Sequence, residues 1–430
     1  METVNSSEKH VVVIGAGFGG MATARSLAKE ENVRVTIVDR RNHHLFQPLL
    51  YQVATTTLSA PEIARSVRSL FANEESVSVL YDAAEDFDLE KKVVKLASGN
   101  DLSYDYLVMA TGARTSFFGN NHWSEHVYQL KSLAGSLAIR EKVLKNIELA
   151  ERSKSEKHNE LTNIVIVGGG PTGVELAGAF ADLIQRSMKH DVNNFNTETQ
   201  RIILIEAQKH VLGVFHEKQS IYTKKALEKL GVEVRTESMV ENIEPNLVSL
   251  KGGEKIEAGT IIWTAGVEAT DITKKLNTEL TRGGLVKVNS NLNLPGHSDV
   301  FVIGDCCAVE QSNGRYVPGV APAAEQGGKY AAKQIVKSMK GEDTSKPFSY
   351  FDKGKMAIIG KGCAIVDFKG IHMQGWLGWA AWLFVHLLCL VDFRSKASVL
   401  ANWFWGYLSN VPGARVFTAA SEDPDNPLKS

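Results

Sequence analysis

Two glycine-rich segments constrain the fold of this chain more than any other feature. The first, VVVIGAGFGG, covers residues 11–20 and has glycines at 15, 17 and 20. The second, IVIVGGGPTGVELAG, covers residues 164–178 and has glycines at 168, 170 and 173. In such a segment the first glycine permits a tight turn, the second lets the backbone approach a pyrophosphate, and the third lets the helix pack closely on the strand. The sequence therefore predicts two dinucleotide-binding sites in one chain.

The residues of the two segments are the first candidate ligand contacts. The phosphate lies at the positive N-terminal end of the helix that follows each turn. We predict contacts from the first segment at Gly15, Gly17, Phe18, Gly19 and Gly20, and from the second at Gly168, Gly170, Pro171, Thr172 and Gly173.

Apolar strands alternate with helical segments around both motifs, and the pattern starts again at residue 164. Such alternation indicates doubly wound α/β domains with parallel sheets. We predict strands at 11–14, 33–39, 106–112, 164–167, 202–206, 261–266 and 299–305, and helices at 21–29 and 171–187. The segment 136–160 is predicted to begin as a helix, and its charged part ERSKSEKHNE to be a solvated helix end and linker. The predicted fold class is α/β, with two Rossmann-type dinucleotide-binding domains and a C-terminal helical segment that associates with a membrane.

Each predicted unit carries an acidic residue at the end of its second strand. Asp39 follows Gly20 by 19 residues, close to the spacing of about 20 that is usual for an acid on a ribose. Glu206 follows Gly173 by 33 residues, and the polar segment 189–200 can absorb the excess. Because such an acid accepts hydrogen bonds from ribose hydroxyls and repels a 2′-phosphate, Glu206 favours NADH over NADPH. We also predict that Arg40, next to Asp39, contacts the first nucleotide.

Two sites imply two nucleotides, and the simplest pair is a bound FAD and a visiting NADH. Small-residue turns follow a strand in each unit: Ala110, Thr111 and Gly112 in the first, and Ala265 and Gly266 in the second. The segment VFVIGDCCAV ends a late strand in Gly-Asp. From residue 10 to about 340 the chain resembles the two-dinucleotide-binding flavoproteins, and the resemblance implies that Gly304 and Asp305 contact FAD.

Cysteine placement separates the chain from two flavoprotein groups. Disulfide reductases carry a redox-active CxxxxC after the first unit, where this chain has RNHHLFQPLLYQVA without cysteine. Sulfide:quinone reductases need cysteines beside the flavin. Here Cys306 and Cys307 adjoin the Gly-Asp turn, and we interpret them as small buried hydrophobic residues.

The same RNHHLFQPLLYQVA segment is similar to one found in type II NADH:quinone oxidoreductases. GVELAG, TSFFG, APAAEQGG and FRSKASVLANWFWGYL resemble the same family. The resemblance implies hydride transfer from NADH to FAD and then transfer of two electrons to a membrane quinone, ubiquinone or menaquinone, without proton pumping.

The resemblance also implies roles for single residues. Gln47, Pro48 and Ala321 would lie at the flavin, and Glu175 near the nicotinamide as a proton relay or simply as an acid at a helix start. Gln326 would donate to a quinone carbonyl, although Pro322 replaces the first glutamine of the family's A-Q-x-A-x-Q pattern. Lys361 would stabilise an anionic reduced flavin or quinol, or be a surface lysine.

Composition excludes several other functions. A net charge of −1 argues against a nucleic-acid surface, which needs a basic excess. The four cysteines have no CxxC spacing, and His43 and His44 have no partner ligands at matching spacing, so we predict no metal site.

The C-terminal region is unusually aromatic. Five of the seven tryptophans lie between Trp376 and Trp405, and residues 371–391 contain no Asp, Glu, Lys or Arg. These 21 residues reach the length of about 20 needed to span a bilayer. However, the tryptophans lie in the middle of the segment, which favours two short helices in the plane of the membrane surface. A spanning helix and a homodimer interface remain alternatives, and residues 421–430 are predicted to be disordered.

These patterns predict an FAD-binding domain at 1–120 and 290–345, an NAD(H)-binding domain at 121–289 and a membrane-anchoring region at 346–430. In a bacterium the enzyme would lie on the cytoplasmic face of the plasma membrane, and the mitochondrial inner membrane is the second option. Two alternatives to quinone reduction stay open: an NADH-dependent reductase of a soluble protein acceptor, and an NADH-sensing flavoprotein with slow turnover.

Overall fold

The computed structural model describes residues 8–152, 159–189, 191–194, 197–311, 314–409 and 413–416. The predicted disordered tail at 421–430 lies outside these residues. The chain forms two compact units, each built from three segments. Unit 1 contains Met1–Leu45, Arg65–Arg114 and Val267–Lys353, and unit 2 contains Phe46–Ala64, Thr115–Gly266 and Gly354–Ser430.

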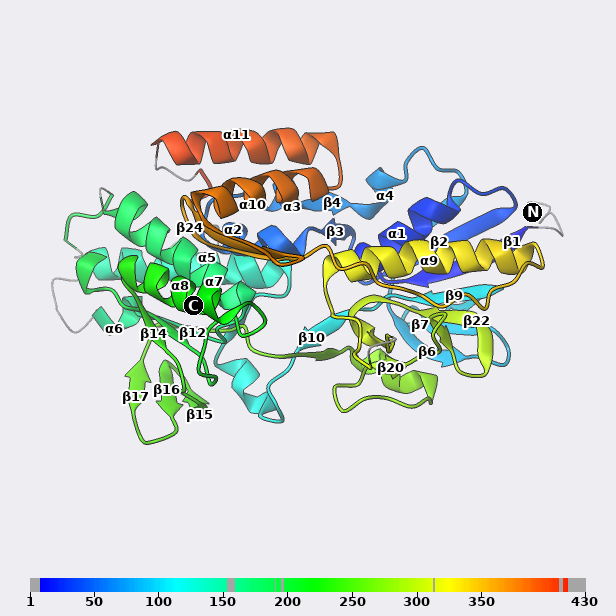
Figure 1. Cartoon of the computed structure of the whole chain (residues 1–430), viewed down its shortest axis with the longest axis horizontal. Coiled ribbons are helices and arrows are strands. Elements are labelled where there is room, and N and C mark those ends of the chain that lie inside the picture. Colours follow the sequence, from blue (N-terminus) through cyan, green and yellow to red (C-terminus); the bar gives the residue numbers. More distant parts are fainter. Residues whose placement is uncertain are drawn as a thin grey trace. The chain divides into compact units, whose positions relative to one another are not determined.

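Unit 1 is built on a six-stranded sheet with the order β21-β22-β9-β1-β2-β5 (Figure 1). The strands pair in parallel except β21, which runs antiparallel to β22. Sheet order departs from chain order at β1, because β2 pairs on one side of it and β9 on the other. Such a switch point leaves a crevice at the carboxyl ends of the strands, where α/β proteins bind ligands. The strands are β1 (Lys9–Ile14), β2 (Val33–Asp39), β5 (Val77–Tyr81), β9 (Tyr106–Met109), β21 (Asn293–Leu294) and β22 (His297–Val302).

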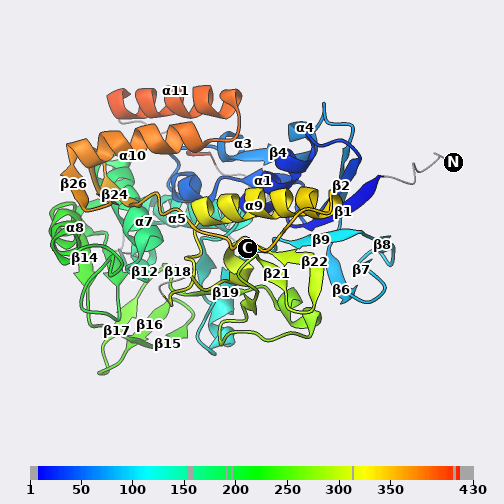
Figure 2. The ribbon, with the colours of Figure 1, turned by 45° about the vertical axis from the view of Figure 1, so that its right-hand side comes forward.

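Two helices of unit 1, α1 (Phe18–Leu27) and α9 (Ala321–Met339), lie side by side (Figures 1 and 2). A side chain at Gly328 would collide with the carbonyl oxygen of Gly19, so this glycine permits the close helix contact. The smaller elements of the unit are β3 (His43–Leu45), α4 (Val67–Leu70), β6 (Ala84–Asp88), β7 (Val93–Leu96), β8 (Asp101–Ser103), β19 (Val267–Ala269), η6 (Asp271–Leu276), β20 (Val286–Lys287), η7 (Gly304–Cys306) and β23 (Cys307–Ala308). β4 (Ala64–Ser66) and β10 (Ala113–Thr115) cross the boundaries between the two units.

Unit 2 repeats the same topology in a five-stranded sheet with the order β11-β18-β12-β13-β14. All four pairings are parallel, and β12 occupies the switch point that β1 occupies in unit 1. The strands are β11 (Tyr128–Gln129), β12 (Ile164–Val167), β13 (Ile202–Ile205), β14 (Val232–Arg235) and β18 (Thr260–Trp263). The helices of this part are α5 (Leu133–Arg152), α6 (Asn159–Thr162), α7 (Pro171–Asp182), which continues as η4 (Leu183–Met188), and α8 (Glu217–Lys229). Its remaining elements are η2 (Asn121–Glu125), η5 (Thr197–Thr199), β15 (Val240–Glu244), β16 (Leu247–Leu250) and β17 (Lys255–Glu257).

An antiparallel sheet completes unit 2 and packs between two helices. It consists of β24 (Lys355–Gly360), β25 (Cys363–Phe368) and β26 (Ile371–Gly375). Gly178 of α7 lies against the carbonyl of Ile359, and Gly378 of α10 (Trp376–Cys389) lies against the carbonyl of Ala364; a side chain at either glycine would collide with that carbonyl. The last helix, α11 (Phe393–Ser409), runs alongside α10 (Figures 1 and 2). Unit 2 also holds η1 (Gln47–Leu49), α2 (Leu50–Ala54) and α3 (Ala60–Ile63).

The predicted α/β fold class, with two Rossmann-type units and C-terminal helices, is confirmed, while several elements have other bounds than predicted. In the segment 136–160, α5 ends at Arg152, residues 153–158 lie outside the described residues, and α6 follows at Asn159–Thr162. The helix expected at 21–29 is α1 and begins at Phe18, because the helix starts directly after the glycine turn. Residues 371–375 form strand β26, so only α10 remains helical in the apolar run at 371–391. Within the described residues, no helix is both long enough and apolar enough to cross a membrane.

Candidate active site

The first cradle, formed by the turn between β1 and α1, is built by three glycines with three different tasks. Gly15 has a φ of +103°, a conformation that side chains with a Cβ rarely adopt. A side chain at Gly20 would collide with the carbonyl of Gly15, so this glycine lets α1 pack against the turn. Gly17 is different, because its φ is −73° and nothing lies within 4 Å of a Cβ placed there. The open space beside Gly17 is therefore free for a ligand.

The second cradle, between β12 and α7, has the same geometry. Gly168 has a φ of +114°, and a side chain at Gly173 would collide with the carbonyl of Gly168. Gly170 has a φ of −72°, and again nothing lies within 4 Å of a Cβ there. Pro171 starts α7, where the missing N–H of proline costs no intrahelical hydrogen bond.

The two acids occupy equivalent positions in the two units. Asp39 accepts hydrogen bonds from the backbone N–H groups of Ala16, at 2.6 Å, and Arg41, at 2.7 Å. Glu206 accepts from the backbone N–H groups of Gly169, at 2.7 Å, and Gln208, at 2.8 Å. Each carboxylate is thus fixed beside its glycine turn.

The turns that follow β9 in unit 1 and β18 in unit 2 also correspond. A side chain at Gly15 would collide with the carbonyl of Ala110, and one at Gly168 would meet the backbone N of Ala265 at 2.8 Å. In unit 1 the hydroxyl of Thr270 donates to that of Thr111 at 3.0 Å. Gly112, Gly266 and Gly304 all have positive φ, between +67° and +73°, as the turns at these positions require.

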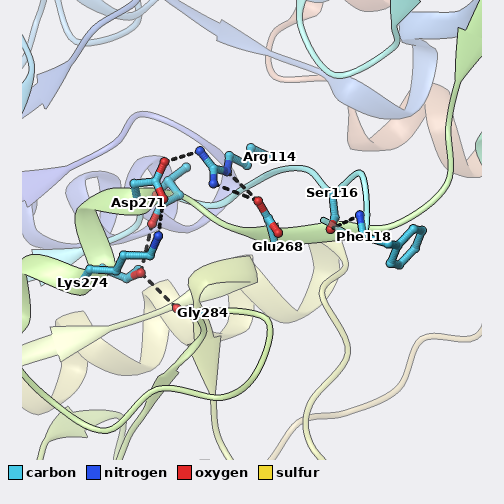
Figure 3. Close-up of polar contacts among 9 residues, drawn as sticks. Arg114, Ser116, Phe118, Glu268, Asp271, Lys274 and Gly284 are labelled. Carbon is cyan, nitrogen blue, oxygen red and sulfur yellow. Dashed lines mark hydrogen bonds and ion pairs between the residues drawn. The ribbon is translucent and has the colours of Figure 1, made fainter. Parts of the chain in front are cut away.

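A charged cluster lies close to the Thr111 turn in unit 1 (Figure 3). Arg114 donates to Glu268 at 2.9 Å and pairs with Asp271, which also pairs with Lys274 at 2.7 Å. These side chains are substantially exposed, so the cluster contributes little to stability. It lies on the strand pair β10–β19 and the start of η6.

His44 and Gln326 are both fixed by contacts with neighbouring residues of unit 1. His44 is buried, its Nδ1 lies 2.9 Å from the carbonyl oxygen of Ala16, and its ring meets Phe18 edge-on. Gln326 on α9 donates to the carbonyl of Phe351 at 3.0 Å and accepts from the N–H of the same residue at 2.9 Å. These contacts use one of the two amide N–H groups of Gln326. Pro322 lies in the first turn of α9, which explains why proline is tolerated there.

A pocket within unit 2 brings together two of the predicted catalytic residues, Glu175 and Lys361. The other lining residues are aromatic, aliphatic, polar or small: Tyr51, Gln52, Thr55, Thr57, Ala179, Asp182, Leu183, Ser187, Ile358, Gly360, Asn402, Trp403, Gly406 and Tyr407. The pocket therefore combines an apolar wall with a few polar groups, the usual composition of a small-molecule site.

Glu175 is the fifth residue of α7 and lies beyond the first turn, so the reading of it as an acid at the helix start is wrong, and its side chain lines this pocket. Burial raises the pKa of its carboxyl group to about 8, and the backbone N–H of Ile358 and the side chain of Trp382 only partly offset this effect. Below that pH the carboxyl group keeps its proton and can donate it. Glu175 therefore has the protonation behaviour that a proton relay needs.

Lys361 follows β24 and reaches the last turns of α11. Its amine donates to the backbone carbonyl oxygen of Tyr407 at 2.6 Å and lies 5.7 Å from the centre of the Tyr407 ring. The backbone N–H of Lys361 donates to Asp182 at 2.7 Å. Lys361 is therefore a part of the pocket wall and is not an isolated surface lysine.

The pocket also contains residues that the sequence analysis missed, chiefly Tyr51, Gln52 and Tyr407. Tyr51 and Gln52 belong to the RNHHLFQPLLYQVA segment, in which only Gln47 and Pro48 were singled out; these two begin η1. The signal that could have found Tyr51 is a phenol in a segment that already carried the family resemblance. Tyr407 carries the same signal, because it lies in the FRSKASVLANWFWGYL segment, but its position in the pocket depends on the packing of α11.

Known proteins share both the sequence pattern and the fold of this chain. Residues 9–328 match the family described as pyridine nucleotide-disulphide oxidoreductase. The chain is 36% identical to the type II NADH:quinone oxidoreductase Ndh of Mycobacterium tuberculosis, over 97% of this chain and 92% of the relative. It is 29% identical to the type II NADH:quinone oxidoreductase of Haemophilus influenzae, over 83% of this chain and 86% of that one. The fold matches that of NDH2 from Plasmodium falciparum, solved in complex with NADH, with a TM-score of 0.88, 21% identity, and coverage of 95% of this chain and 100% of the other.

The chain therefore belongs to the pyridine nucleotide-disulphide oxidoreductases, and within them to the type II NADH:quinone oxidoreductases. The predicted family and the predicted enzyme class are thus confirmed. A flavin is typical of this family, in agreement with the predicted cofactors.

Proposed function

We propose that the protein binds FAD in unit 1 and NADH in unit 2 and reduces a membrane quinone without pumping protons. The observation that carries this proposal is the duplicated cradle. Each unit has an open space beside its second glycine that suits a ligand, and a carboxylate fixed beside the same turn. When bound, FAD accepts a hydride from NADH and passes two electrons to the quinone.

The residues of unit 1 suit an FAD. The pyrophosphate would lie in the open space at Gly17, at the N-terminal end of α1. Asp39 would accept from the adenosine ribose, and Arg40 borders a small pocket beside it. The remaining proposed contacts in unit 1 are Gly15, Phe18, Gly19, Gly20, Ala110, Thr111, Gly112, Gly304, Asp305 and Ala321. Gln47 and Pro48 belong to unit 2, and their flavin contacts stay predictions.

The residues of unit 2 suit NADH in the same way. The proposed contacts are Gly168, Gly170, Pro171, Thr172, Gly173, Ala265 and Gly266, with Glu206 at the ribose. An FAD domain and an NAD(H) domain with these contacts remain our proposal.

We assign the quinone head group to the pocket of unit 2. Its aromatic wall suits a quinone ring, and Glu175 can supply a proton as the quinone is reduced. Lys361 adds a positive charge that stabilises an anionic reduced form. Gln326 belongs to unit 1 and does not line this pocket, so its role as a quinone donor stays a separate prediction.

The outer faces of α10 and α11 support contact with a lipid surface. Ten large hydrophobic side chains on these two helices are exposed, namely Trp376, Leu377, Phe384, Val385, Leu388, Phe393, Leu400, Phe404, Trp405 and Leu408. On α11 the buried residues Ser395, Val399 and Trp403 recur every four positions and form one face of the helix. The residues on the opposite face are therefore exposed to solvent. Helices of 14 and 17 residues lying in the interface place the enzyme where a lipid-dissolved quinone is found. A soluble protein acceptor gives no reason for this exposed apolar face.

A rapid-mixing experiment tests the proposed function. NADH should bleach the absorbance of the bound flavin in a single turnover, and a short-chain quinone should then restore it within the turnover time. Bleaching that only a soluble electron-transfer protein reverses would support the alternative acceptor instead.

A further inference from the structure

Three buried side chains of unit 2 form a hydrogen-bonded chain that starts on α11 and ends at the pocket. The indole N–H of Trp403 donates to Oε1 of Gln52 at 2.7 Å. Nε2 of Gln52 donates to the hydroxyl oxygen of Tyr51 at 2.8 Å. All three side chains are almost completely buried, with exposed fractions of 3%, 3% and 4% in this order.

The direction of every bond in this chain is fixed by chemistry. An indole N–H can only donate, so it must meet the carbonyl oxygen of the Gln52 amide. The NH₂ group of Gln52 therefore faces Tyr51, and the Tyr51 oxygen accepts. The hydroxyl hydrogen of Tyr51 must then point elsewhere, and the structure gives it no acceptor in the part of the chain that it describes.

The open direction for this hydrogen is the pocket. Tyr51 and Gln52 both line it, together with Glu175. Burial raises the pKa of the Tyr51 hydroxyl well above its usual range, and the nearby Glu175 carboxyl group raises it further. The hydroxyl therefore keeps its proton. A phenol that always carries its proton, with that proton unused by the protein, is a ready hydrogen-bond donor for a ligand.

We propose that the Tyr51 hydroxyl donates a hydrogen bond to a carbonyl oxygen of the quinone, and that Trp403 is a positioning residue that aims this donor through Gln52. The inference rests on the proposed function of the pocket. Negative charge builds on the quinone oxygens as electrons arrive, and a donor placed there in advance stabilises this charge. Because Trp403 belongs to α11, the packing of the proposed membrane helix sets the orientation of a group in the active site.

This arrangement makes a specific prediction for a residue that does not itself donate to the substrate. In Trp403→Phe the ring is retained but the N–H is lost, so the Gln52 amide can turn over. Its oxygen then accepts the Tyr51 hydrogen and withdraws the donor from the pocket. Trp403→Phe should therefore reproduce much of the effect of Tyr51→Phe.

The test uses the full-length flavin-loaded protein with Tyr51→Phe, Trp403→Phe and the double variant. Trp405→Phe changes an exposed tryptophan of the same helix, outside the pocket lining, and is the control. NADH oxidation is measured with a short-chain quinone and with ferricyanide, which needs no quinone pocket. Calorimetric titration gives the Kd of the quinone independently of turnover.

We expect Tyr51→Phe to lower kcat/KM for quinone by about tenfold to a hundredfold, the range for loss of one donor to a developing charge. Activity with ferricyanide should stay within about twofold, and the Kd should rise, since the donor also binds the ground state. The double variant should be no worse than Tyr51→Phe, because both changes remove one and the same donor. The Trp405→Phe control should resemble the wild type.

Two results would overturn the proposal: full quinone activity in Tyr51→Phe, or additive losses in the double variant. If Tyr51→Phe does not fold, as judged by flavin content and Tm, Trp403→Phe decides by the same criteria. A wild-type protein that oxidises NADH but reduces no quinone overturns the proposed function itself. That outcome is seen before any variant is compared, so the two failures are distinguishable.

Discussion

The carboxylate of Glu206 accepts a hydrogen bond of 2.7 Å from the backbone N–H of Gly169, which fixes the acid beside the second phosphate cradle. Asp39 holds the same position beside Ala16 in the other unit. The backbone contacts to Gly169 and Gln208 use one lone pair on each oxygen of Glu206, so both oxygens can still accept from ribose hydroxyls.

This geometry predicts a preference for NADH. A 2′-phosphate would meet the fixed negative charge of Glu206, so kcat/KM should be more than about tenfold higher with NADH than with NADPH. Glu206→Gln removes the charge at nearly constant size and should narrow the ratio, whereas Glu241→Gln, at an exposed position, should not. Equal rates with both nucleotides in the wild type would contradict the assignment.

Substitution of Gly17 or Gly170, the two cradle glycines with free space at Cβ, should block the binding of one nucleotide at a time. Gly17 and Gly170 both have negative φ, and both have free space at Cβ, so valine there should leave the fold intact. Gly17→Val should yield a folded protein without flavin absorbance. Gly170→Val should keep its flavin but show a KM for NADH raised by about tenfold or more.

Circular dichroism and flavin release after denaturation check these two variants. A yellow and active Gly17→Val protein would show that the first cradle does not hold FAD. Gly20→Ala is the contrasting control, because its side chain would collide with the carbonyl of Gly15, and we expect it to disturb folding itself.

The sequence was sufficient for the parts of the fold that depend on local chemistry. The glycine turns, the parallel strands and the two acids all follow from short-range requirements, so Gly15 and Asp39 could be predicted to lie together. The three-segment composition of each unit could not, because it depends on which distant segments pack together. The predicted domain bounds stay predictions: 1–120 with 290–345 for FAD, 121–289 for NAD(H) and 346–430 for membrane anchoring.

Side-chain partners formed across distant segments could not be predicted either. The bond between Trp403 and Gln52 joins positions 351 residues apart in the chain, and no periodicity encodes it. The sequence analysis treated all five clustered tryptophans as one apolar surface. In the structure Trp382 and Trp403 are buried, while Trp376 and Trp405 are 66% and 63% exposed.

The raised pKa of Glu175 predicts the pH dependence of the reaction. With a pKa of about 8, the carboxyl group loses its proton as the pH rises through that value. Quinone turnover should therefore fall above about pH 8 in the wild type, and Glu175→Gln should be slower but without this decline. The nearby Tyr51 and Tyr407 hydroxyls have pKa values raised by burial, so they stay protonated throughout this window.

The same shift affects stability in a defined direction. Since the folded-state pKa lies above the ordinary value of 4.5, the folded protein binds its proton more tightly, and stability is lost as the pH rises from 4.5 to 8. The Tm of the wild type should fall relative to that of Glu175→Gln across this window. A constant difference in Tm would contradict the assigned pKa.

The exposed apolar side chains of α10 and α11 predict that the protein binds membranes. Acidic substitutions on these side chains should abolish the binding. Phe384→Glu, Trp405→Glu and Leu408→Glu together place three charges on exposed side chains, so the core of unit 2 is untouched. Sedimentation with liposomes should drop to background, while NADH oxidation with ferricyanide should be unchanged. Met239→Glu, an exposed residue elsewhere in unit 2, is the matched control. If the triple variant still sediments, or if the wild type is a dimer that buries this face in solution, the lipid contact is wrong.

The central claim is that electrons pass from NADH to a quinone through this protein, and one stoichiometric measurement tests it most directly. Purified protein in liposomes with a long-chain quinone and an internal pH dye is given NADH, and NADH loss and quinol formation are followed together. We predict one quinol formed per NADH oxidised, with no change of internal pH. NADH oxidation without matching quinol formation would contradict the claim.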